Sequence, residues 1–223
     1  MAKKCAFNKQ VGWIELITGP MFAGKSAELI RRLKRFEYAD VKYLVFKPKV
    51  DTRSCQEIIS RNGSRLSSIE VSESAQILEY LMDNDCCEQV RAIGIDEAQF
   101  FDDGIIEVCN ILAENNYVVI VSGLDKNFKG EPFGAIGKLS VHAENVTKLS
   151  AVCVDCGADA SFSMRTVNKK PASYNDEEIL IGCAEQYVAV CRHHHKVPNR
   201  PYTNNNSKVF IDFCKDKRKN KKD

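Results

Sequence analysis

Apolar and polar residues follow one another along the first two thirds of the chain in blocks that predict strands separated by helices. Trp13–Thr18 is a mostly apolar run typical of a strand, and the residues from Ala27 to about Ala39 carry apolar side chains at helical spacing. Lys42–Lys47, Val90–Ile95 and Tyr117–Gly123 are further short apolar runs typical of buried strands. Because strands alternate with helices, we expect a parallel sheet with helices on both faces, that is, an α/β fold.

Two more helices are expected between the later strands. Ser72 to Met82 has helical periodicity with Ser72 as the candidate N-cap, and Gly104 to about Glu114 forms the next helix. The stretch from Lys49 to Ser68 is irregular, apart from a short strand expected at Glu57–Ile59. Arginines in this stretch are ordinarily surface charges, but one of them could close over phosphates with its bidentate guanidinium.

A phosphate-binding pattern lies between the first predicted strand and the first predicted helix. It is G-x-x-x-x-G-K-[ST], in which glycines let the backbone N–H groups point into one concavity at the positive end of the helix. Lys25 would reach the β- and γ-phosphates of ATP, and the Ser26 hydroxyl would bind Mg²⁺. The alternative, a glycine-containing turn that binds nothing, is disfavoured by the strand–helix context. The residues are Gly19, Pro20, Met21, Phe22, Ala23, Gly24, Lys25 and Ser26.

Two acidic residues, Asp96 and Glu97, follow the predicted strand Val90–Ile95. Ligands of open α/β sheets sit at the carboxyl ends of the strands, where the phosphate loop also lies. Asp96 is therefore the second candidate Mg²⁺ ligand, and Glu97 is the candidate general base for an attacking hydroxyl. The alternative is a pair of exposed turn carboxylates. These residues alone do not identify whether the attacked hydroxyl belongs to water or to a second substrate.

A metal site is predicted in the last third of the chain. Cys153 and Cys156 form a C-x-x-C pair, and Cys191 precedes three consecutive histidines at 193–195. Two ligand pairs separated by a hairpin-like excursion are typical of a tetrahedral structural Zn²⁺ site. Any of the three histidines could be the fourth ligand, and His194 repeats the spacing of the first pair. The rival interpretation is a redox pair, which usually opens a helix in a thioredoxin-like unit.

The chain is expected to divide into three regions. Residues 1–150 would form the nucleotide-binding domain, 151–197 the zinc-anchored domain and 198–223 a flexible basic tail. The excursion inside the zinc domain is either a lid or a solvent hairpin.

Composition narrows the class of protein. The 223-residue chain has a net charge of only +2, which argues against binding of nucleic acid or membrane through overall charge. Its apolar runs are too short to span a bilayer, and the N-terminus lacks a stretch of signal-peptide type. We therefore expect a cytoplasmic protein, whose ten cysteines serve metal binding or core packing rather than disulfides.

Together the motifs resemble those of the type II thymidine kinases, the family of the human cytosolic enzyme, and the chain is identified as a bacterial member. The resemblance extends from about Gly12 to Lys196. It rests on residues 19–26, Ile95–Phe101, Leu124–Phe128, Pro132–Gly134, Lys148–Cys153 and Tyr187–Cys191.

The resemblance implies a P-loop, RecA-like sheet with a zinc-anchored lasso that closes over the nucleoside. It implies transfer of the ATP γ-phosphate to the 5′-hydroxyl of thymidine or deoxyuridine, with Glu97 as the base. It places Arg61, Asp96 and Gln99 in the ATP site. The lasso backbone would hydrogen-bond the base. The residues matching those around the nucleoside are Met21, Phe101, Leu124, Phe128, Phe133, Tyr187, Ile179, Leu180, Ile181 and Gly182.

The resemblance further implies a homotetramer that works in nucleoside salvage and is inhibited by thymidine triphosphate. Many members end the metal motif with a second C-x-x-C, whereas this chain has Cys191-Arg192-His193-His194, which implies a Cys₃His site. The main alternative to the kinase is a P-loop ATPase acting on nucleic acid through a zinc ribbon, and it predicts a basic stripe that the net charge does not support. A non-catalytic nucleotide-binding regulator would lack the base or the magnesium ligand.

Overall fold

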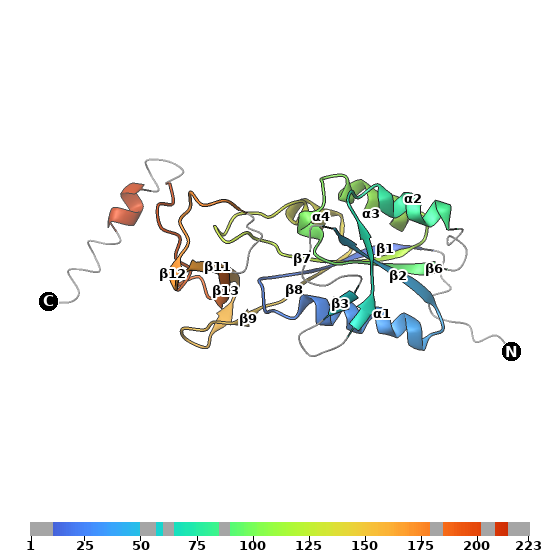
Figure 1. Ribbon diagram of the computed structural model, residues 1–223, viewed down its shortest axis with the longest axis horizontal. Helices are drawn as coiled ribbons and strands as arrows, with labels where there is room; N and C mark the ends of the chain where they lie inside the picture. The colour runs from blue at the N-terminus through green and yellow to red at the C-terminus, as the bar shows by residue number, and fades with distance from the viewer. Residues whose placement is uncertain are drawn as a thin grey trace.

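The computed structural model describes residues 11–49, 57–59, 65–84, 90–178, 185–201 and 208–213. They form a larger α/β part and a smaller part built of short strands, which lie end to end (Figure 1). Two predictions, the contact of Arg61 with phosphates and that of residues 179–182 with the base, fall outside the described residues. In the tail that follows, residues 208–213 form a short helix.

A six-stranded parallel sheet forms the centre of the larger part, with strand order β5-β2-β6-β7-β1-β8. Because β7 lies between β6 and β1 and all three strands are parallel, the residues that follow them lie close together at the carboxyl ends of the strands. The phosphate loop and the acidic pair were predicted at these carboxyl ends. The strands are β1 (Trp13–Thr18), β2 (Lys42–Pro48), β5 (Ile69–Val71), β6 (Val90–Ile95), β7 (Val118–Gly123) and β8 (Asn145–Lys148).

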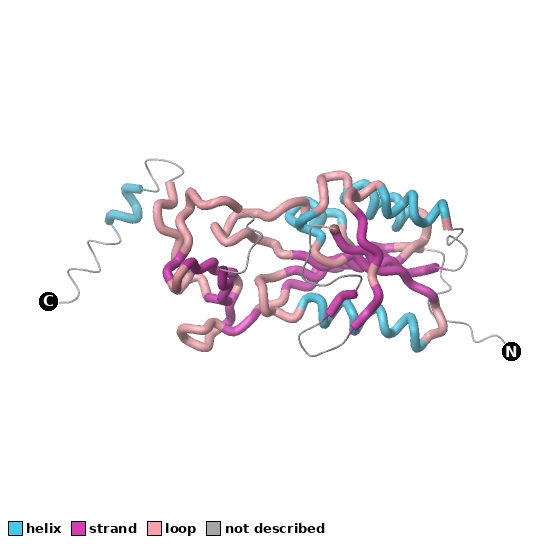
Figure 2. Tube along the Cα trace, viewed as in Figure 1, coloured by secondary structure: helices cyan, strands magenta, loops and turns pink. Residues whose placement is uncertain are grey.

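Helices cover both faces of the sheet, as predicted (Figures 1 and 2). One face carries α1 (Lys25–Tyr38), and the other carries α2 (Gln76–Asp83), α3 (Ile105–Glu114) and α4 (Ile136–His142). A hairpin of β3 (Glu57–Ile59) and β4 (Arg65–Ser67) also packs on the α1 face, through Ile58 and Leu66.

Each face of the sheet has its own hydrophobic core, because successive side chains of a strand point to opposite sides of the sheet. Leu16 and Ile17 are neighbours on β1, yet Leu16 packs in the core with α3 and Ile17 packs in the core with α1. On α1, the buried Leu29, Leu33 and Phe36 repeat at helical spacing, as the sequence pattern predicted. The apolar run of each strand therefore supplies two separate cores.

The start predicted for the second helix is wrong. The helix begins at Gln76 rather than at Ser72, and Ser72 does not cap it. Ser74 instead donates from its backbone N–H and its hydroxyl to the Asp102 carboxylate, at 2.9 and 2.7 Å. The side chain of Gln76 accepts the N–H of Ser72 at 2.7 Å. The tertiary bonds to Asp102 and the local bond to Gln76 hold residues 72–74 in a turn, so the helix begins only after them.

The smaller part has little core of its own. Its strand β11 pairs antiparallel with β12 and β13, and among the described residues its buried cluster consists of six. A cluster of that size cannot stabilise an independent fold, so this part depends on other interactions. Its strands are β9 (Ala151–Val152), β10 (Asp159–Ala160), β11 (Phe162–Val167), β12 (Lys170–Pro171) and β13 (Glu185–Val190).

Among the helices that the structure describes, none combines the length and the apolar character needed to cross a bilayer.

An ion-pair network ties the polar side of α1 to the sheet. Glu28 lies 2.6 Å from Arg31 and 2.8 Å from Arg32. Arg32 also reaches Glu15 on β1 at 2.5 Å and Thr147 on β8 at 2.8 Å. The hydrogen bond from Arg31, assisted by the one from Arg32, lowers the pKa of Glu28 from 4.5 to about 2 against the effect of burial.

We expect Glu28→Gln to lower the free energy of unfolding at pH 7 by about 1 kcal/mol, a value reduced by solvent screening of the exposed Arg31. Because the folded-state pKa is lowered, the stabilisation is present above pH 4.5 and is lost as the pH falls toward 2. Urea unfolding of both proteins at pH 7 and pH 3 measures this. Glu79→Gln, an exposed change on α2, is the control, and an equal difference at both pH values would contradict the prediction.

Candidate active site

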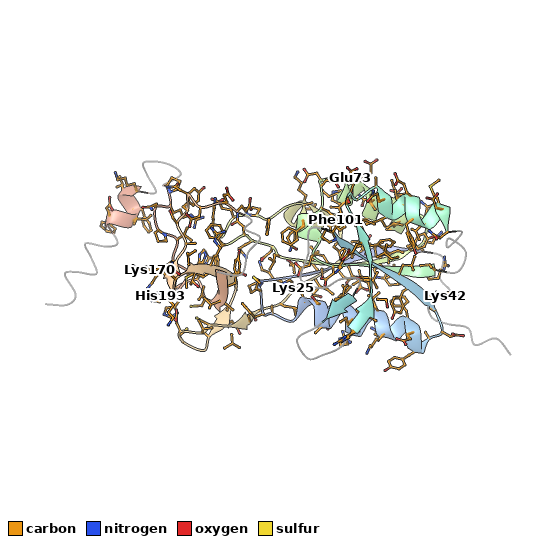
Figure 3. All side chains as sticks on the ribbon, viewed as in Figure 1. Lys25, Lys42, Glu73, Phe101, Lys170 and His193 are labelled. Carbon is orange, nitrogen blue, oxygen red and sulfur yellow. The ribbon has the colours of Figure 1, made fainter. Side chains whose placement is uncertain are left out.

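The loop between β1 and α1 has a backbone shape that depends on two glycines. Gly19 has φ +140°, and a Cβ atom there would lie 2.3 Å from the carbonyl oxygen of Leu149. Gly24 has φ 84° and immediately precedes α1, so the first N–H groups of that helix open onto the loop. Lys25 Nζ lies 2.9 Å from the carbonyl oxygen of Pro20, so its side chain folds back over the loop. Figure 3 shows Lys25 near the place where the two parts of the molecule meet.

The smaller part contacts the phosphate loop directly. The backbone N–H of Met21 donates to the hydroxyl of Ser163 on β11 at 2.8 Å, and Ser163 is buried. Strand β11 of the smaller part therefore lies directly next to the phosphate loop, where a bound nucleotide would be close to it. Sequence reasoning missed Ser163 because a single serine inside a strand belongs to no motif.

Asp96 lies at the centre of the carboxyl edge of the sheet and is only 5 % exposed. The hydroxyl of Ser122 on β7 and the backbone N–H of Glu97 both donate to its Oδ1. The hydroxyl of Ser26 lies near enough to lower the pKa of Asp96. Burial, and then the charge of Glu97, raise the pKa of Asp96 to about 6. The structure thus brings the two predicted Mg²⁺ ligands together. Their oxygen atoms are the donor type that Mg²⁺ prefers, and a cation would offset the cost of the buried carboxylate.

The carboxylate of Glu97 is held by its neighbour in the short helix η2 (Ala98–Phe100). Gln99 Nε2 donates to Glu97 Oε2 at 2.5 Å, while Gln99 Oε1 accepts the N–H of Leu124 at 2.9 Å. Gln99, predicted in the ATP site, is 3 % exposed, so its amide orients Glu97 rather than facing solvent. Glu97 itself has φ 51°, a left-handed conformation that costs free energy for a residue with a Cβ and that is common at functional sites.

The aromatic residues predicted around the nucleoside lie beside η2 and on the loop after β7. Phe101, Phe128 and Phe133 are buried, and Phe133 packs edge-on against Phe100 with ring centres 5.6 Å apart. The other three predicted residues are partly exposed: Met21, Leu124 and Tyr187.

These residues are connected through the smaller part. Tyr187 on β13 pairs with Arg165 on β11, whose guanidinium carbon lies 3.9 Å from the ring centre of Phe128. The backbone N–H of Met21 is hydrogen-bonded to Ser163 on the same strand, β11. Strand β11 therefore contacts both the phosphate loop, through Ser163, and the loop after β7, through Arg165. The guanidinium of Arg165 thus lies against an aromatic ring of the larger part.

The predicted metal ligands meet at the base of the smaller part. The sulfur atoms of Cys153, Cys156 and Cys191 and a ring nitrogen of His194 lie within 4.8 Å of one another. Cys156 Sγ and Cys191 Sγ are 3.9 Å apart, and His194 Nδ1 is 3.5 Å from Cys153 Sγ and 3.3 Å from Cys191 Sγ. A tetrahedral ion with Zn–S bonds of about 2.3 Å separates its sulfur ligands by about 3.8 Å. The donors and their spacing therefore fit Zn²⁺.

Local geometry distinguishes the three consecutive histidines. His193 is exposed (Figure 3), and His195 turns away from the cysteines to donate from Nε2 to the carbonyl oxygen of Phe128 at 2.8 Å. Burial would raise the pKa of the Cys153 thiol, but backbone hydrogen bonds, first of all from Cys191, lower it to about 6. The thiolate, which is the form that binds metal, is thus favoured at this position.

Comparison with known proteins agrees with this geometry. The model of the family described as thymidine kinase matches residues 12–195. The chain is 64% identical to a thymidine kinase of Ureaplasma parvum serovar 3 and 65% identical to one of Ureaplasma urealyticum serovar 10, each over 221 residues and 99% of both chains. It is 55% identical over 211 residues to a thymidine kinase of Mycoplasmoides gallisepticum, which covers 94% of this chain and 92% of the relative. With a matching family model and relatives of nearly full length, the chain belongs to the thymidine kinase family.

Proposed function

We propose that this protein transfers the γ-phosphate of ATP to the 5′-hydroxyl of thymidine, and of deoxyuridine, to produce the monophosphate for nucleotide salvage. The observation that carries the proposal is Glu97, an oriented carboxylate that directly follows the buried Asp96, at the sheet end where Ser26 of the phosphate loop lies near Asp96. Such a site holds a nucleoside triphosphate and a base within reach of a second substrate. Membership of the family supports thymidine as that substrate.

Each residue of the loop has a separate task in this proposal. Backbone N–H groups of residues 19–26 bind the phosphates, and Lys25 exchanges the carbonyl of Pro20 for the β- and γ-phosphate oxygens. Ser26 and Asp96 would hold Mg²⁺, which supplies positive charge against the phosphates when bound. Arg61 is proposed as a further phosphate contact.

Glu97 accepts the proton of the 5′-hydroxyl while Gln99 keeps its carboxylate oriented. As the O–H bond loses its proton to Glu97, the 5′-oxygen bonds to the γ-phosphorus. The bond from that phosphorus to the β,γ-bridging oxygen breaks, and ADP leaves with that oxygen.

The nucleoside is proposed to lie among Phe101, Phe128 and Phe133, whose burial supports an enclosed apolar site for a flat ring. Met21, Leu124 and Tyr187 would complete it, with the backbone of residues 179–182 on the base. We further propose that the protein is a cytoplasmic homotetramer inhibited by thymidine triphosphate, as the family resemblance implies.

A phosphate-transfer assay with ATP and Mg²⁺ tests the proposed reaction. It compares thymidine, deoxyuridine, deoxycytidine, single-stranded DNA and water as acceptors. We expect thymidine 5′-monophosphate as the main product. Free phosphate released only in the presence of DNA would overturn the proposal in favour of an ATPase acting on nucleic acid.

The role of Glu97 is tested by Glu97→Gln, which keeps the size of the side chain and its hydrogen bond from Gln99 but removes the basic oxygen. We expect binding of ATP and thymidine to persist while turnover falls by about a hundredfold or more, the usual effect of losing a positioned base. Steady-state kinetics and calorimetry measure the two effects. Glu107→Gln on the exposed side of α3 is the control, and near-normal turnover of Glu97→Gln would remove the residue from the base role.

We also propose that Cys153, Cys156, Cys191 and His194 hold one structural Zn²⁺. His194→Ala is expected to lower the zinc content measured by plasma mass spectrometry and the resistance of the smaller part to proteolysis, because its core is too small to fold without metal. The matched control is His193→Ala, which removes the adjacent exposed imidazole and should retain zinc. Loss of zinc from the control together with full zinc occupancy in His194→Ala would show that His193, and not His194, is the fourth ligand.

A further inference from the structure

The two parts of the molecule are fastened together at residues 127–131, which we call the junction loop. Asn127 organises the loop, because its Oδ1 accepts two backbone N–H groups of the loop, both at 3.0 Å. Its Nδ2 donates to Glu178 of the smaller part at 2.8 Å. The hydroxyl of Tyr174 donates to the carboxylate of Glu131 at 2.9 Å. The segment 174–178 is therefore attached to the junction loop at both of its ends.

Arg165 lies inside this junction. It is 1 % exposed and heads the set of large, fully buried side chains among the described residues. Its guanidinium carbon lies 3.9 Å from the ring centre of Phe128, and Nη1 donates to the carbonyl oxygen of Glu177 at 2.7 Å. Nη2 is 3.7 Å from a carboxylate oxygen of Asp176. One side chain thus touches the junction loop and the segment opposite it.

The zinc end of the smaller part holds Phe128 from a second direction. His195 donates from Nε2 to the carbonyl oxygen of Phe128 at 2.8 Å, and its ring stacks on Phe162 with centres 4.5 Å apart. The backbone N–H of His195 in turn donates to the carbonyl oxygen of Cys191 at 3.0 Å. Both the main chain and the ring of Phe128 are therefore positioned by the smaller part.

A buried guanidinium is costly, and an apolar side chain of similar length would fill the same space without the desolvation penalty. An apolar side chain, however, cannot donate a hydrogen bond to the carbonyl oxygen of Glu177 while it lies over the ring of Phe128. Lysine cannot do both either, because its ammonium is a point charge without a planar face. The combination of contacts is specific to arginine, and its effect is geometric: it sets the distance between the ring and the opposite segment.

We propose that Arg165 is a positioning residue for the nucleoside. By holding Phe128 against the segment 176–178, it organises the aromatic side of the active site before the nucleoside binds, which reduces the ordering cost of binding. This inference rests on the proposed function, in which Phe128 contacts the base. The contacts of Arg165 described above are with Phe128 and with the segment 176–178, on the aromatic side of the site.

Kinetics of Arg165→Lys and Arg165→Met provide the first test. We expect the KM for thymidine to rise about tenfold in both, the loss typical of one buried guanidinium–aromatic contact, and the KM for ATP to stay unchanged. A variant that is merely less stable would lose active enzyme, and hence turnover, without raising one KM alone. The matched control is Arg192→Lys, since Arg192 is exposed and lies 5.0 Å from the Phe162 ring instead. An unchanged KM for thymidine in both Arg165 variants would overturn the proposal.

Hydrogen exchange followed by mass spectrometry gives a second readout that needs no activity. In Arg165→Lys, amides of the junction loop and of residues 174–178 should exchange faster, while those around Cys153 and Cys156 should not change. Equal exchange of the junction loop in wild type and variant would refute the positioning role. If the wild type did not phosphorylate thymidine, the proposed function would fail, and exchange would still decide whether Arg165 holds the junction.

Discussion

The buried carboxylate of Asp96 is the constraint on which the rest of the active site depends. A charge with so little solvent needs polar neighbours, and the fold brings donor groups near it from three places: Ser26 at the start of α1, Ser122 on β7 and the backbone of Glu97. Ser122 and Glu97 hydrogen-bond to the carboxylate directly. The sheet order makes this convergence possible, because β7 lies between the strands that precede the other two donors. Even so, burial and the neighbouring charge leave the pKa of Asp96 at about 6. The site thus carries an electrostatic cost that a bound cation would remove.

Next to this carboxylate, the backbone adopts a conformation that the sequence would not choose locally. Glu97 is left-handed at φ 51°, and Gln99 holds its side chain while also accepting the N–H of Leu124. Strain of this kind persists only where the surroundings determine the geometry. Here the surroundings are the ends of β6 and β7. The same contacts that stabilise the loop therefore fix the orientation of the Glu97 carboxylate.

The smaller part is held by contacts with the larger one. Its described residues form a buried cluster of only six, so it relies on contacts with the α/β part and on the Cys₃His cluster at its base, which could hold a metal ion. Those contacts converge on two places, Ser163 against Met21 in the phosphate loop and Arg165 with His195 against Phe128. Folding of the smaller part and organisation of the active site are therefore coupled physically.

The sequence by itself determined the features that local patterns encode. Apolar runs identified the central strands β1, β2, β6 and β7, helical spacing identified α1 and α3, and glycine spacing identified the phosphate loop between β1 and α1. The acidic pair and the three cysteines of the candidate metal cluster were also recognisable from residue type and spacing, whereas the choice among the three histidines stayed open. The short elements β5, β8 and α4 were missed, since three to seven residues contain too little periodicity.

Only the tertiary structure decided what depends on contacts between distant segments. It placed Gln99 between Glu97 and Leu124, delayed α2 through the bond between Ser74 and Asp102, and turned His195 away from the cysteines. It also buried Arg165 beneath Phe128, although arginines are ordinarily surface residues. The physical reason is the same in each case. A hydrogen bond or a stacked pair between segments far apart in the chain leaves no periodic trace in either segment, so these positions followed from the fold and not from any local pattern.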